Sequence, residues 1–236
     1  MANDTTIDIC FDIEVAGIEW EEVDELTRGY LLDRERDEAR RAAIPESTAL
    51  YLGLGKIIAI GMWNLESDQG ALLLEGPPGG KLQLTDYERM PGCKVARGTE
   101  SEILKEFWKI VGPGGRRKRL ISFNGRGYDI PHMAVRSAMH QIKPSRQLDT
   151  KPWDRDSHAD LMDILNFGNS GTQFRYKLDY WCRRFDIESP KTKLDGSQIA
   201  RAYREKKIED IGEYCLRDTR ATAELYRKIK PTLIDL

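Results

Sequence analysis

Short segments rich in apolar and β-branched residues recur in the first half of the chain and predict β-strands. In residues 7–15 (IDICFDIEV), Asp12 and Glu14 are two positions apart, so their side chains would lie on one face of the strand. Further strands are expected at 56–65 (KIIAIGMWNL), 71–75 (ALLLE) and 116–125 (RRKRLISFNG). The first three strands would form an antiparallel meander.

Apolar residues with a spacing near 3.6 predict helices in the later segments. Thr99 and Glu102 have the spacing of a capping box at the start of the first helix, and Asp129 would open the second. Residues 141–160 are expected to be a loop. The predicted helices are 101–111, 129–140, 174–185, 196–207 and 208–229. Early strands followed by helices indicate one α/β domain over residues 1–236, with a mixed sheet flanked by α-helices.

Residues 16–50 form a charged insertion between the first two predicted strands. The segment is far longer than a tight hairpin and alternates acidic and basic residues. One interpretation is a solvated surface helix with many salt bridges. The other is a mobile flap over Asp12 and Glu14, because long insertions beside active sites often act as lids.

Composition limits the possible partners. The 37 basic residues nearly balance the 39 acidic ones, so a polyanion would have to bind at a local basic patch. We find no run of about 18 apolar residues and no secretory signal at the amino terminus, and we expect a cytoplasmic protein without a membrane partner. The four cysteines are widely spaced and lack a CxxC pair, which favours reduced, buried thiols.

Five residues suggest a metal site: Asp12, Glu14, Asp129, Tyr214 and Asp218. The first two share a strand face, the third lies where a strand leads into a helix, and the last two lie one helical turn apart. Four carboxylates held together would repel one another strongly unless cations offset the charge. Oxygen ligands favour Mg²⁺ or Mn²⁺ over zinc.

Two such ions about 3.5–4 Å apart would suit phosphodiester hydrolysis, because one activates water and the other stabilises the leaving oxygen. The phenol of Tyr214, with an ordinary pKa near about 10, would orient the water without deprotonating it.

The motifs FDIE (11–14), NGRGYD (124–129) and YCLRD (214–218) resemble, in this order, the three motifs of the DEDD 3'-5' exonucleases. Tyr214 corresponds to the tyrosine branch, since Glu213 stands where the other branch has histidine. The chain is most similar to stand-alone exonucleases related to the proofreading domain of B-family DNA polymerases. The resemblance implies a ribonuclease H-like fold and two Mg²⁺ or Mn²⁺ ions bound by Asp12, Glu14, Asp129 and Asp218.

The implied substrate is the 3' end of single-stranded DNA. Asn124, Arg126, Tyr128 and Lys193 are candidates for nucleic-acid binding, with stacking and phosphate contacts as their expected roles. The first three also suit ordinary roles as a turn former, a solvated charge and a core aromatic residue. Two other functions stay open, an exoribonuclease of the same fold and a non-catalytic module that binds nucleic acid.

Overall fold

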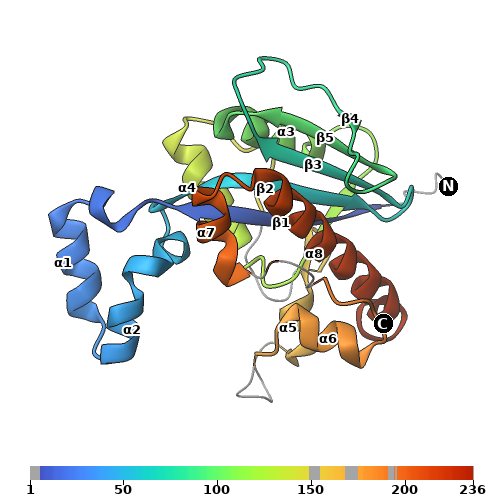
Figure 1. The fold of residues 1–236 in the computed structure, drawn as a ribbon. Coiled ribbons are helices and arrows are strands. Elements are labelled where there is room, and N and C mark those ends of the chain that lie inside the picture. The colour runs from blue at the N-terminus through green and yellow to red at the C-terminus, as the bar shows by residue number, and fades with distance from the viewer. Residues whose placement is uncertain (1–5, 149–154, 168–174, 191–193, 195, 236) are drawn as a thin grey trace.

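The computed structural model describes residues 6–148, 155–167, 175–190, 194 and 196–235. A seven-stranded mixed sheet forms its centre, with strand order β4-β5-β3-β2-β1-β6-β7 (Figure 1). The strands are β1 Ile7–Gly17, β2 Gly55–Asn64, β3 Gln69–Glu75, β4 Thr85–Asp86, β5 Cys93–Gly98, β6 Lys118–Ser122 and β7 His158–Asp160. The predicted α/β class, of the ribonuclease H-like type, is confirmed.

The predicted meander is also confirmed, because β2 pairs antiparallel with both β1 and β3. Three strands were missed by the sequence pattern. β4 and β7 have two and three residues, too few to show a period, and β7 lies in a segment that we expected to be a loop. β5 (CKVARG) pairs in parallel with β3, and the residues of β5 alone do not predict this non-local contact.

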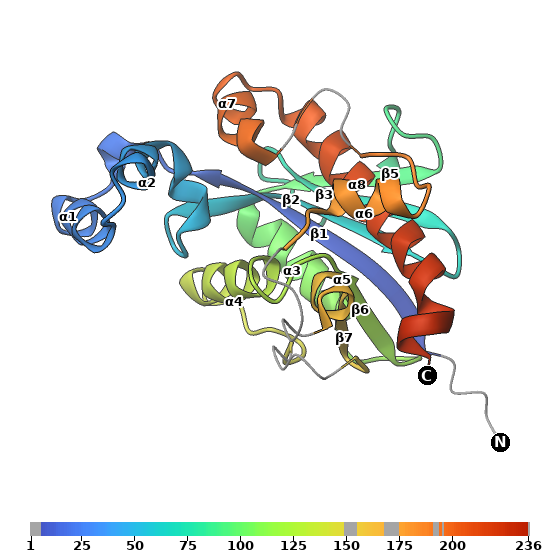
Figure 2. The same ribbon diagram turned by 90° about the horizontal axis from the view of Figure 1, so that it is seen from below.

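Helices cover both faces of the sheet, with α3 and α4 on one face and α7 and α8 on the other (Figure 2). The helices of the main body are α3 Glu100–Val111, α4 Asp129–Met139, α5 Leu161–Leu165, α6 Leu178–Arg184, α7 Ile199–Arg204 and α8 Ile208–Ile229, with the short helical turns η4 Gly196–Gln198 and η5 Lys230–Ile234. Among the described residues, no helix is both long enough and apolar enough to span a membrane.

Side-chain alternation along β1 divides the core into two parts. Ile9, Phe11 and Ile13 pack with the apolar residues of α3 and α4. Cys10 belongs to the cluster that includes the buried face of α8. Asp12 and Glu14 continue the alternation that Cys10 begins, so they face α8. All four cysteines are free and buried, as expected.

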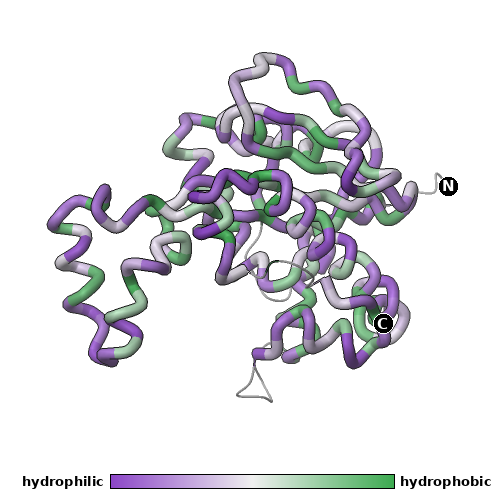
Figure 3. Tube along the Cα trace, viewed as in Figure 1, coloured by the Kyte–Doolittle hydropathy of each residue, from purple (hydrophilic) through white to green (hydrophobic). Residues whose placement is uncertain are grey.

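The charged insertion folds as an arm, which we define as α1 Glu25–Arg34 and α2 Glu38–Ala43 with the flanking turns η1 Trp20–Glu22 and η2 Pro45–Leu50. The segment is exposed and helical, as one of the two interpretations held, but it forms two helices because Asp37 accepts a 2.9 Å hydrogen bond from the N–H of Arg40 and starts the second. Neither α1 nor α2 has a buried residue, and Leu26 is 86% exposed. The arm is largely hydrophilic (Figure 3), and its helices α1 and α2 extend beyond the end of β1 (Figure 1). Its base stays close to α7, because Arg204 pairs with Glu46 of η2 at 3.5 Å.

Candidate active site

Two glycines allow α8 to lie directly on the sheet. Gly61 of β2 pairs with Asp12 of β1, and a Cβ at Gly61 would lie 2.4 Å from the Oγ1 of Thr219. A Cβ at Gly212 of α8 would lie 2.8 Å from the Cδ2 of Leu72. Both distances are shorter than any van der Waals contact, so larger residues would push the helix away. The close approach brings the middle of α8 next to Asp12.

The second motif is joined to the first by one long-range hydrogen bond. The N–H of Ile13 donates to Oδ1 of Asp129 at 3.1 Å. Ile13 stands between Asp12 and Glu14, so this bond holds the start of α4 beside both carboxylates. The turn before α4 uses Asn124 in a left-handed conformation, with a φ of 66°.

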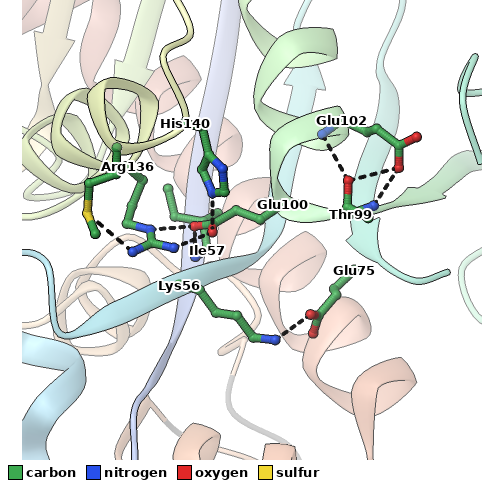
Figure 4. A network of polar contacts seen from close by, with 9 residues as sticks. Lys56, Ile57, Glu75, Thr99, Glu100, Glu102, Arg136 and His140 are labelled. Carbon is green, nitrogen blue, oxygen red and sulfur yellow. Dashed lines mark hydrogen bonds and ion pairs between the residues drawn. The ribbon is translucent and has the colours of Figure 1, made fainter. Parts of the chain in front are cut away.

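A buried ion pair fixes α4 from its other end (Figure 4). The carboxylate of Glu100, in the first turn of α3, accepts a 2.7 Å hydrogen bond from the N–H of Ile57 in β2. The same carboxylate pairs with the guanidinium of Arg136 and contacts Nε2 of His140 at 2.7 Å. Glu100 therefore links α3, β2 and α4, the helix that begins at Asp129.

Asp160 is a residue that our sequence analysis missed. It is 1% exposed, and its carboxylate accepts 2.9 Å hydrogen bonds from the N–H groups of Asn124 and Arg126. It also caps α5 through the N–H of Met162 at 3.0 Å. An aspartate before the apolar run LMDIL is the signal for such a cap. The hydrogen bonds from Asp160 to the loop of the second motif depend on the pairing of β6 with β7. No local sequence pattern predicts that pairing.

Burial and mutual repulsion mark the site electrostatically. Burial raises the pKa of Asp12 well above its ordinary value, and repulsion from Asp129, Glu14 and Asp218 raises that pKa further. Burial raises the pKa of Glu14 in the same way, with repulsion from Asp218 and Asp129. Burial also raises the pKa of Asp129, to about 7, although the N–H of Ile13 opposes the rise. The charges of the four carboxylates are thus close enough to affect one another's pKa.

The phenol of Tyr214 belongs to the same group. Burial raises its pKa far above the usual value, and the charges of Asp218, Glu14 and Asp12 add to the rise. A hydrogen bond to Asp218 acts in the same direction. The phenol therefore stays protonated at neutral pH.

Glu14 gives the clearest sign of a bound cation. Its side chain is 8% exposed, and within the described part of the chain no hydrogen-bond donor or basic group contacts its carboxylate. A buried, unpaired carboxylate is costly. Asp12, which keeps some exposure, offers a second carboxylate from the same strand face. The donor set fits a divalent cation.

The comparison with protein families gives a match over residues 79–232, more than half of the chain, to a family described as a predicted 3'-5' exonuclease related to the exonuclease domain of PolB. The chain belongs to this family. The match includes Asp129, Tyr214 and Asp218, whereas Asp12 and Glu14 lie before its first residue. A comparison with curated proteins gives no match.

In this exonuclease-related chain, a cavity of about 320 Å³ opens beside two of the site residues, Tyr214 and Asp218. Its other described lining residues come from the second-motif loop, α5, α6 and the segments that precede α7: Phe123, Asn124, Met162, Lys177, Leu178, Asp179, Pro190, Gly196 and Ser197. The cavity is thus bordered by a phenol, carboxylates and one lysine.

The residues that were predicted to bind nucleic acid lie in different environments. Asn124 lines the cavity. Arg126 points inward, with its guanidinium 3.1 Å from Asp163 and 2.7 Å from the carbonyl of His158. The hydroxyl of Tyr128 donates to the carbonyl of Ala49 at 3.2 Å. Lys193 lies outside the described residues. Binding of nucleic acid by these residues stays a prediction.

A second, larger cavity of about 740 Å³ opens near the end of β1. It begins at Ala16, two residues after Glu14, and is bordered by α7 and the residues that follow it. Its lining carries charges of both signs. Lys56 pairs there with Glu75 at 2.6 Å, and Lys206 is exposed.

Proposed function

We propose that this chain is a metal-dependent 3'-5' exonuclease that removes nucleotides from the 3' end of single-stranded DNA. The observation that carries the proposal is the buried carboxylate of Glu14, which has no donor or cation in the described part of the chain and faces three further carboxylates. Membership in a family of predicted exonucleases supports the same reaction class.

Four carboxylates would hold two Mg²⁺ or Mn²⁺ ions, namely those of Asp12, Glu14, Asp129 and Asp218. When bound, the ions would supply an activated water and stabilise the leaving oxygen. In the reaction, the water oxygen forms a bond to the terminal phosphorus, and the bond from that phosphorus to the 3' oxygen of the preceding nucleotide breaks. The product is a 5'-mononucleotide.

Tyr214 would position the attacking water. Its phenol is protonated at neutral pH, so it acts as a hydrogen-bonding group and not as a base. Its hydrogen bond to Asp218 fixes the orientation of the hydroxyl. A phenylalanine at this position would keep the ring and lose this bond.

The substrate would pass along the face of β1. The 3' end would occupy the cavity at Tyr214 and Asp218, and the adjoining nucleotides would follow β1 to the cavity at Ala16. DNA is favoured over RNA because the family is related to the exonuclease of a DNA polymerase. Faster trimming of RNA than of a DNA oligonucleotide with the same sequence would instead support the exoribonuclease.

The direct test compares Asp12→Asn with Asp86→Asn, a matched change at an exposed aspartate of β4. Mn²⁺- or Mg²⁺-dependent trimming should be lost in the first variant and kept in the second, with both proteins folded by circular dichroism. Full activity in Asp12→Asn excludes the proposed metal site. Binding of strands without any turnover by the wild-type protein would favour the non-catalytic module.

A further inference from the structure

Cys215 lies beside Asp12 and Glu14, although neither the sequence motifs nor the two-metal scheme gives it a role. Its thiol is completely buried. Its Sγ lies 3.5 Å from the backbone oxygen of Asp12 and 3.9 Å from Oδ2 of the same residue. The thiol therefore contacts a residue that is proposed to bind metal.

The ligand atoms of three residues lie close enough to share one ion. Among the described histidines, cysteines, aspartates and glutamates, the set with ligand atoms all within 4.8 Å of one another is Asp12, Glu14 and Cys215. Glu14 supplies the independent sign of a ligand, because it is buried without a donor in the described residues. The position of Cys215 is fixed by α8, whose Thr219 hydroxyl donates to the Cys215 carbonyl at 2.7 Å.

The distances suit a tetrahedral ion. Bonds of about 2.3 Å to sulfur and about 2.0 Å to oxygen require the sulfur and oxygen to be about 3.5 Å apart. Cys215 Sγ and Asp12 Oδ2 are 3.9 Å apart, so a shift of a few tenths of an ångström would complete this pair of bonds. Glu14 would provide the third ligand, and a water or a substrate oxygen the fourth.

We propose that Asp12, Glu14 and Cys215 bind a thiophilic divalent cation, of the class of Zn²⁺ or Cd²⁺, at the same carboxylates that the proposed function assigns to Mg²⁺ or Mn²⁺. Coordination replaces the thiol S–H bond with a metal–sulfur bond, and the proton leaves to solvent. A soft sulfur ligand favours these ions over Mg²⁺. Thiophilic cations would therefore compete with the ions that support hydrolysis.

If the thiol of Cys215 served only in packing, it would not bind a cation. Free cysteine often serves as a small buried apolar residue, and Cys93 of β5 is such a case, with its Sγ near Trp63 and Gly70. Cys93 is absent from the set of clustered ligands found among the described residues. It offers a matched control for any change at Cys215.

The test is a titration of the purified wild-type chain with Cd²⁺, followed by the ultraviolet charge-transfer absorption of a cadmium–thiolate bond. We expect one equivalent to produce the band, Cys215→Ser to abolish it, and Cys93→Ser to retain it. An unchanged band in Cys215→Ser, or no band in the wild-type chain, would overturn the inference.

Two further measurements keep the inference testable if Cys215→Ser does not fold. The ¹¹³Cd resonance of the wild-type chain should have the shift of a site with one thiolate, and the shift of an all-oxygen site contradicts the inference. Where the chain hydrolyses DNA, Zn²⁺ should inhibit it, and the inhibiting concentration should rise about tenfold or more in Cys215→Ser. The spectroscopic results do not depend on hydrolysis, so failure of the proposed function and failure of this inference are separable.

Discussion

The N–H of Ile13 donates a 3.1 Å hydrogen bond to Oδ1 of Asp129, across 116 residues of sequence. This bond joins the strand that carries Asp12 and Glu14 to the helix that begins at Asp129. An asparagine at position 129 could still accept it through its amide oxygen, whereas an alanine could not. An asparagine at position 129 would therefore remove the negative charge and keep the hydrogen bond to β1.

Asp129→Asn should therefore fold and yet lose activity. We expect kcat to fall by at least about 100-fold, more than an outer contact of a metal site usually contributes. In EDTA, the variant should have a higher Tm than the wild-type chain, by about 2–4 °C for each kcal/mol of carboxylate repulsion relieved. A lower Tm in EDTA would show that the charge of Asp129 does not oppose folding.

Stability of the metal-free chain should fall as pH rises. The pKa of Asp129 is about 7 in the folded chain, against an ordinary value of 3.8, so the folded state binds the extra proton between these limits. The contribution of Asp129 to the free energy of unfolding is fully present below about pH 4 and is lost as pH rises through about 7. The expected result is a decreasing Tm in EDTA from pH 5 to 8, and a smaller decrease when Mn²⁺ is added. An equal decrease with and without metal contradicts the cation account.

Gly61→Ala should separate α8 from the sheet. The new Cβ would lie 2.4 Å from Oγ1 of Thr219, and relief of such a clash costs about 1–3 kcal/mol. Urea unfolding should show this loss, and trimming should fall because Tyr214 and Asp218 move with the helix. Gly29→Ala in α1 is the matched control, since nothing lies within 4 Å of its new Cβ. The control should be neutral or slightly stabilising, as expected for alanine in an exposed helix.

Lys206→Glu tests whether the DNA strand passes through the larger cavity. Loss of a positive charge that faces phosphates should raise KM about 3- to 10-fold at low salt with little change in kcat, and the difference should shrink at high salt. Lys228→Glu, an exposed charge reversal on α8, is the control. Equal KM values for the two variants would show that the DNA strand does not pass through the larger cavity.

The sequence predicted the parts of the fold whose signals are local. β1, β2, β3, β6 and the helices α3, α4 and α8 follow from apolar spacing and, for α3, from a capping box that the structure contains. The short strands β4 and β7 carry too few residues for a period, and parallel pairing is a non-local property.

The site shows the same division. The five motif residues could be chosen by type and spacing, and the structure brings Asp12, Glu14, Asp129, Tyr214 and Asp218 together. Asp160 and Glu100 could not be chosen, because each acts through partners far along the chain. Arg126 was a candidate for a phosphate contact, with a solvated charge as the alternative, and its observed ion pair with Asp163 depends on how α5 packs beside the loop.

The most direct measurement of the central claim follows a 5'-labelled single-stranded DNA oligonucleotide incubated with the wild-type chain and Mn²⁺ or Mg²⁺. The proposed exonuclease should give a ladder of products that shortens one nucleotide at a time from the 3' end and disappears with EDTA or in Asp218→Asn. Release of the label as a mononucleotide, or an unchanged ladder in Asp218→Asn, would contradict it.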